Sequence, residues 1–434
     1  MKKNLFKMAG VVALTFAMSA CTKDVLDLDK TLKFTALSVE KQKEAINESG
    51  NDFIENMNEV ENSDGFKALS ELNSSLSPDD AATAPMALII SKLKSNALTQ
   101  DINALENIDK QIRSAASSSN PNSLENVPLW GEFVWNSTSK EFDKVKVLYN
   151  QTIYSFPSSS KSTTNDATLN FDYKEVIVQN SYMPESYSLK IKIGQNTILS
   201  FDYAATYDPD KTVTKEKNSL TIDKFNWNYE FKNNKKEISA KMTIKNGQTT
   251  LVKYEIGSAG VFTYNTMGNL SFDADNIKNP NSNGGILPGG SNAVNSGSMY
   301  FQVMDVAMLG GFKDYQAFYN ELQVLSEKNT SYDEAYYNDQ AKIYNKYLIM
   351  YAFFVKENNK FADVEYFNEI TTEPYKMYAL KPRLILSDDS KVSDFNKYAA
   401  DNFKTLNDKY HKVDSIFNDV KRNYDGDYYY EYNY

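Results

Sequence analysis

The stretch that decides the fold is residues 225–256, FNWNYEFKNNKKEISAKMTIKNGQTTLVKYEI. Aromatic and polar residues alternate at its start, where Phe225, Trp227 and Tyr229 are separated by single asparagines. Alternation of this kind predicts a strand with one buried and one solvated face, which is typical of antiparallel sheets. The Asn-Gly pair at 246–247 favours the positive φ angles of a tight turn. The stretch therefore predicts consecutive antiparallel strands that include a hairpin.

The same alternation extends over the middle of the chain, for example at Leu189, Ile191 and Ile193. We predict a central antiparallel β meander of about eight strands at residues 122–275, as a curved sheet, a sandwich or an open barrel. Residues 276–298, which follow, are rich in Asn, Gly, Ser and Pro. A segment of that length without periodicity is either a linker or a functional lid, and the linker is the favoured interpretation.

A helical period precedes the meander, at residues 33–118. Val39, Ile46, Phe53 and Val60 recur every seven residues, so a helix formed there would have one apolar face. Further apolar stripes follow in the same range. We therefore predict a small N-terminal helical bundle.

Both periods occur in residues 299–434, which predict an α+β segment with long helices. Ser331 and Glu334 form a capping box, so a helix should begin there. The last helix should carry an apolar seam from Phe403 to Tyr424. A mature chain of 414 residues is expected to form about two or three domains, and the predicted fold class is α+β.

The N-terminus has the features of an export signal. Residues 1–20 combine a lysine-rich start, a short apolar run and the small residues Ser19 and Ala20, directly before Cys21. The apolar run is too short for a bilayer core, which needs about 20 apolar residues, so it predicts a cleaved signal peptide. Small residues before a cysteine resemble the lipobox of bacterial lipoproteins, which implies cleavage before Cys21 and acyl chains on its thiol. Residues 21–32 would then be the lipidated cysteine and its tether, anchored lastingly by two or more acyl chains.

Acidic residues follow the cysteine at Asp24, Asp27 and Asp29, and they resemble the surface-export signal of Bacteroidota lipoproteins. A plain solvated tether is the alternative interpretation. With helices around a β meander, the chain as a whole is similar to outer-membrane lipoproteins of that phylum, although the resemblance carries no known site. It implies a lipid-anchored protein of the outer membrane that faces either the cell surface or the periplasm.

Charge and composition argue against several functions. Removal of residues 1–20 takes away three lysines and changes the formal net charge from −10 to −13, so no nucleic-acid partner is expected. Cys21 is the only cysteine and His411 the only histidine, so we expect no disulfide, no Cys/His zinc site and no catalytic triad. Residues 279–290 resemble a calcium loop that lacks its final glutamate. We therefore predict no catalytic residue, no metal and no cofactor.

Two tryptophans are the candidate ligand-binding residues. Trp130 and Trp135 could form a platform on which sugar rings stack, although core packing is the usual role of such residues in alternating strands. The favoured hypothesis is a non-catalytic protein of the cell envelope that binds or scaffolds a glycan or a surface protein, with the acyl chains on Cys21 in the membrane. One alternative is a carboxylate-based glycan hydrolase, which needs only two carboxylates about 5–10 Å apart. The other is a carrier of an apolar ligand in the β meander.

Overall fold

The computed structural model describes residues 32–68, 130–159, 162–262, 294–312, 314–328, 331–371 and 376–403. Its strands are β1 (Gly131–Asn136), β2 (Glu141–Lys146), β3 (Gln151–Phe156), β4 (Ala167–Val178), β5 (Ser181–Ile193), β6 (Asn196–Tyr207), β7 (Val213–Ile222), β8 (Phe225–Asn233), β9 (Glu237–Asn246), β10 (Thr249–Gly260), β11 (Val294–Val303), β12 (Val306–Phe312), β13 (Leu348–Phe354), β14 (Asn359–Thr371), β15 (Met377–Leu386) and β16 (Lys391–Val392). Its helices are α3 (Val39–Asn62), α9 (Tyr315–Lys328), α10 (Glu334–Tyr347) and α11 (Phe395–Asn402).

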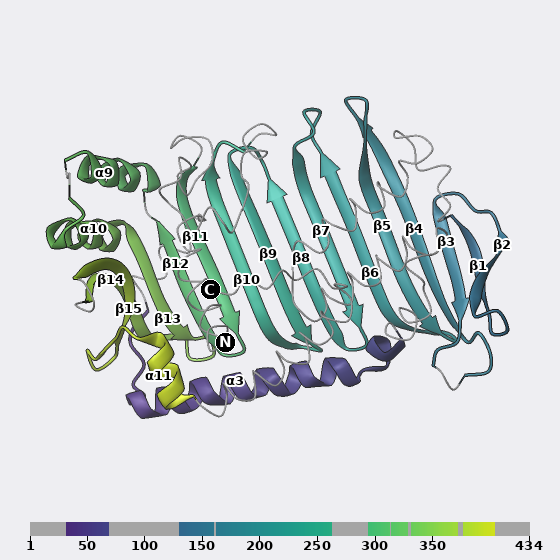
Figure 1. Cartoon of the computed structure of the whole chain (residues 1–434), viewed down its shortest axis with the longest axis horizontal. Helices are drawn as coiled ribbons and strands as arrows, with labels where there is room; N and C mark the ends of the chain where they lie inside the picture. The colour runs from purple at the N-terminus through teal and green to yellow at the C-terminus, as the bar shows by residue number, and fades with distance from the viewer. Residues whose placement is uncertain are drawn as a thin grey trace.

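All the strands of the described residues belong to one sheet of 16 strands (Figure 1). From β3 to β16 each strand lies beside the next one in the sequence, and β1 lies between β2 and β3. Neighbouring strands are antiparallel except for β1 and β3, which are parallel. The predicted α+β class and the antiparallel meander are therefore confirmed, and the meander is one part of a larger sheet.

Alternation of side chains sets the two faces of this sheet. Trp227 on β8 lies opposite Leu220 on β7 and Ile244 on β9, and all three side chains are buried. The predicted hairpin is also confirmed, because Gly247 joins β9 to β10 with a φ of +55°. In contrast, the predicted linker at 276–298 is wrong at its C-terminal end, because β11 begins at Val294 and pairs with β10, so the sheet continues into that segment.

Helix α3 runs along one end of the strands (Figure 1). At its start, Ile46 packs against a core cluster that includes Ala352 on β13. At its other end, Met57 and Val60 are buried in the main core, which also contains Ile222 on β7. The apolar stripe predicted from the seven-residue period is therefore confirmed, and it packs against the sheet at that end.

Helices α9 and α10 pack together at the other end of the strands (Figure 1). The ring of Phe318 on α9 meets the ring of Tyr344 on α10 edge to face, with centroids 5.0 Å apart. A helix is present where the capping box predicts one, but α10 begins two residues later, at Glu334, and its N-cap is Asp333, whose carboxylate accepts a hydrogen bond from the backbone N–H of Tyr336 at 3.1 Å. The predicted Ser331 cap instead donates to the Asp333 carboxylate, because Asp333 stands directly before the first helical residue.

Two predictions about helices are not supported. Within residues 33–118, the described part is α3 with a short helical turn after it, and α3 packs on a sheet and not in a helical bundle. The described C-terminal helices have 14, 14 and 8 residues, so long helices are not supported either. The predicted helix from Phe403 to Tyr424 lies outside the described residues beyond its first residue. An apolar stripe has the same period whether a helix or a sheet covers it, which is why the sequence pattern misled.

Candidate functional site

The candidate site is a line of side chains across the sheet, which we call the tyrosine row. Its members lie opposite one another in successive strands and on one face: Tyr173 (β4), Tyr187 (β5), Tyr203 (β6), Asn218 (β7), Tyr229 (β8), Met242 (β9) and Tyr254 (β10). The row crosses the face that carries the main core, so it joins buried packing to a partly exposed surface.

The rings at the start of the row are stacked. Tyr187 and Tyr203 have ring centroids 4.4 Å apart and planes 12° apart, and Tyr173 stacks on Tyr187 at 6.3 Å and 17°. Tyr173 and Tyr187 are buried, whereas Tyr203 is half-buried. Side chains of a strand stand roughly perpendicular to the sheet, so stacked rings present their edges outward. The row is therefore an aromatic strip that is buried at Tyr173 and Tyr187 and partly exposed at Tyr203, Tyr229 and Tyr254.

A buried amide interrupts the tyrosines at Asn218, whose side chain is 5% exposed. Its Nδ2 donates to Oε1 of Glu216 on the same strand at 3.1 Å. Its Oδ1 is fully buried and has no hydrogen-bond partner. A flipped amide would point Oδ1 at the Glu216 carboxylate, so the orientation with an unsatisfied oxygen is the favourable one. Asn218 therefore offers an acceptor to any donor that reaches it.

Burial keeps the phenols of the row protonated. Burial raises the pKa of Tyr254 to about 12. Burial and then the negative charge of Glu216 raise the pKa of Tyr203 and of Tyr229 far above the usual value. At neutral pH these hydroxyls are donors as well as acceptors.

The opposite face of the same strands is polar and internally paired. Lys217, Glu230, Lys241 and Glu255 lie opposite one another on β7 to β10, so charges alternate across the strands. Lys217 is 3.3 Å from the Glu230 carboxylate, and Lys241 and Lys253 are each 2.9 Å from the Glu255 carboxylate. Because these charges neutralise one another, this face has little need of an external charged partner.

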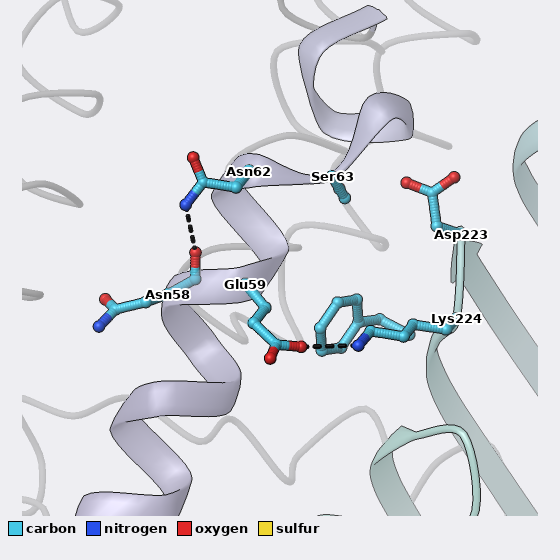
Figure 2. Close-up of a pocket in the computed structure, with 7 residues that line it drawn as sticks. Asn58, Glu59, Asn62, Ser63, Asp223 and Lys224 are labelled. Atoms are coloured by element: carbon cyan, nitrogen blue, oxygen red, sulfur yellow. Dashed lines mark hydrogen bonds and ion pairs between the residues drawn. The ribbon is translucent and has the colours of Figure 1, made fainter.

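A shallow groove of about 470 Å³ lies between the end of α3 and the β7–β8 turn (Figure 2). Glu59 and Lys224 form an ion pair across it at 2.7 Å. The hydrogen bond from Lys224 holds the pKa of the Glu59 carboxyl below its usual value. Beside it, the backbone N–H of Gly65 donates to the Asp223 carboxylate at 2.9 Å. These contacts seat the helix on the turn, so we assign the groove a structural role.

The candidate residues predicted from the sequence do not meet in one site. Trp130 is 1% exposed and stacks on Phe171, with centroids 6.0 Å apart, so a sugar cannot reach its ring in this arrangement. Trp135 is half-buried and packs edge to face on Phe142 at 5.2 Å. Cys21 and His411 lie outside the described residues, as does the loop at 279–290.

The sequence analysis missed the tyrosine row. Its members do stand at alternating positions of the strands, but only the register between strands brings them into one line. No family model matches the chain, and neither a curated protein nor a solved structure is similar to it. Within the described ranges, no helix is long and apolar enough to cross a membrane, and no group of three His, Cys, Asp or Glu residues could hold a metal ion.

Proposed function

We propose that the protein is an extracytoplasmic lipoprotein, anchored by acyl chains on Cys21, that binds or scaffolds a component of the cell envelope without catalysis. The tyrosine row is its binding surface, and this row is the observation that carries the proposal. Seven consecutive strands align five tyrosines with Asn218 and Met242, and the tyrosines combine a broad apolar body with a polar tip. Such side chains favour binding, because a preorganised aromatic surface loses little conformational entropy when it meets a ligand.

The path of the chain after the tether supports an anchored protein. The backbone N–H of Thr35 donates to the carbonyl of Lys360 on β14 at 2.7 Å, and the N–H of Lys360 donates to the carbonyl of Lys33 at 2.8 Å. The chain is thus fixed to the sheet within a few residues of Leu32. Cys21 precedes Leu32 by eleven residues, which span at most about 38 Å when extended. A lipidated Cys21 would therefore keep the sheet close to the membrane.

The proposal is tested by protease treatment of intact cells and of lysed cells. Removal of the protein from intact cells, with a cytoplasmic control protected, is expected if it faces the surface. Survival until lysis would instead place it on the periplasmic side, where the same role in the envelope applies. The Cys21→Ser variant should lose its membrane association, and a variant that stays in the membrane fraction would contradict anchoring through Cys21.

The non-catalytic part of the proposal has a separate test. The purified mature protein is incubated with polysaccharides from isolated cell envelopes, and newly formed reducing ends are measured. We expect none above a boiled control. Steady release of reducing ends would refute the proposal in favour of the carboxylate-based hydrolase.

A further inference from the structure

We infer that the tyrosine row is a binding site for a neutral, extended oligosaccharide, in which Oδ1 of Asn218 accepts a hydrogen bond from a sugar hydroxyl. This inference rests on the proposed binding function and names the ligand class of the same surface. It is built on three observations: the buried acceptor, the charge beside it, and the direction of the row.

The buried acceptor requires a donor. Oδ1 of Asn218 is unpaired in a position that excludes water, and a buried acceptor without a partner is unfavourable. In the register of the sheet Asn218 lies between Tyr203 and Tyr229. No hydrogen bond joins the Tyr229 hydroxyl to another described residue, so the Tyr229 ring can shift without losing one. A ligand that moves this ring aside would satisfy the acceptor and gain a phenol as a second partner.

The charge beside the acceptor selects the ligand class. Glu216 holds Nδ2 of Asn218 at 3.1 Å, and it influences the phenols of Tyr203 and Tyr229 electrostatically. A carboxylate at this position repels anionic ligands and accepts hydrogen bonds from neutral ones. Sugar hydroxyls supply donors to Asn218 and Glu216, and they can pair with the phenol hydroxyls in either direction. The aromatic rings and the Met242 side chain complete the row with apolar surface for the C–H groups of a sugar.

The direction of the row favours an extended glycan over a peptide. Between its partly exposed members Tyr203 and Tyr254 the row crosses four strand spacings, a span of about 19 Å. The backbone groups of these interior strands bond to their neighbours within the sheet. A peptide that binds by strand addition needs a free sheet edge, which the face of the sheet does not provide. A ligand on this face can therefore bind only through side-chain contacts, and such contacts suit a chain of hydroxyl-bearing sugar rings.

The test uses the full mature chain with Cys21→Ser, screened against an array of neutral oligosaccharides and then titrated by calorimetry. Hexagalacturonate serves as the anionic comparator. We expect at least one neutral oligosaccharide to bind. Asn218→Ala and Tyr203→Ala should each weaken this binding about tenfold, which is the order of effect of one buried hydrogen bond. Asn228→Ala is the matched control, because Asn228 stands on the next strand and its side chain bonds to Ser219 on the opposite face.

Each result of these binding measurements either supports or contradicts the proposed site. Circular dichroism and the unfolding temperature show whether a variant is folded, and Tyr229→Phe, which removes one hydroxyl and keeps the ring, should still weaken binding in a folded protein. Equal loss in Asn228→Ala, or no loss in the row variants, would overturn the site. Binding of hexagalacturonate as strong as that of the neutral sugars would overturn the ligand class. If no neutral oligosaccharide binds, the inference is wrong, whereas the proposed function fails only if the Cys21 and reducing-end tests fail.

Discussion

A methyl group at position 65 should loosen the end of α3 from the sheet. Gly65 follows the helix, and its N–H donates to the Asp223 carboxylate in the β7–β8 turn at 2.9 Å. A Cβ added to Gly65 would overlap the carbonyl oxygen of Ile198 and would lie 2.8 Å from Cγ2 of Ile222. One of these obstacles is backbone, so Gly65→Ala cannot be relieved by a rotamer change alone.

The magnitude follows from these contacts. Overpacking of a well-packed site costs about 1–3 kcal/mol. The Ile198 carbonyl also accepts a hydrogen bond from the backbone N–H of Asp223 at 3.0 Å, so a shift of that carbonyl adds about 1 kcal/mol. We therefore expect Gly65→Ala to lower the free energy of unfolding by about 2–4 kcal/mol.

Urea denaturation followed by tryptophan fluorescence measures this change. Gly247→Asn is the control, because a Cβ at Gly247 would meet no atom within 4 Å and asparagine tolerates its positive φ of +55°. The control should stay within about 0.5 kcal/mol of the wild type. If Gly65→Ala were equally mild, the close seating of the helix end on Ile198 would be wrong.

Three further predictions concern the core, the polar face and alkaline pH. Met57→Ala should lower the free energy of unfolding by about 2–5 kcal/mol in the same urea assay, because Met57 is buried in the main core; a change below about 1 kcal/mol would contradict its packing. Glu255→Gln should lower the free energy of unfolding by at most about 1 kcal/mol, and by less at high salt, because the ion pairs of Glu255 with its two lysines are partly solvated; a larger loss that does not depend on salt would contradict this partial solvation. Burial raises the pKa of Tyr254 and, together with the charge of Glu255, that of Tyr300 to about 12, against about 10 in the unfolded chain. A raised pKa stabilises the fold below the unfolded value, so stability should fall as the pH rises from about 10 through about 12, and urea midpoints that stay constant over that range would contradict the burial of these phenols.

Several features of this fold could be read from the sequence because they are local. The alternation around Trp227 predicts a strand with one buried face, and the Asn-Gly pair at 246–247 predicts the hairpin that joins β9 to β10. The stripe through Val60 predicts a helix with one apolar side. The lipobox before Cys21 is also local, and the resulting anchor stays a prediction.

What covers each apolar face was decided only in the tertiary structure. The stripe of α3 packs on the sheet, and β11 pairs with β10 although it begins within the predicted linker at 276–298, and no periodic pattern specifies either partner. The physical reason is that a period of two or of 3.6 residues fixes which side chains share a face and leaves the identity of the opposing surface open.

The candidate site shows most clearly which features the sequence determines and which features depend on the tertiary structure. The sequence by itself determined that Tyr203 and Tyr229 point to one side of their strands. Only the register of β6, β7 and β8 placed Asn218 between them, because pairing between strands depends on turns and on packing across the whole sheet. A slip of one residue in one strand would turn Asn218 to the polar face and break the row, so the tyrosine row exists only at the level of the assembled sheet.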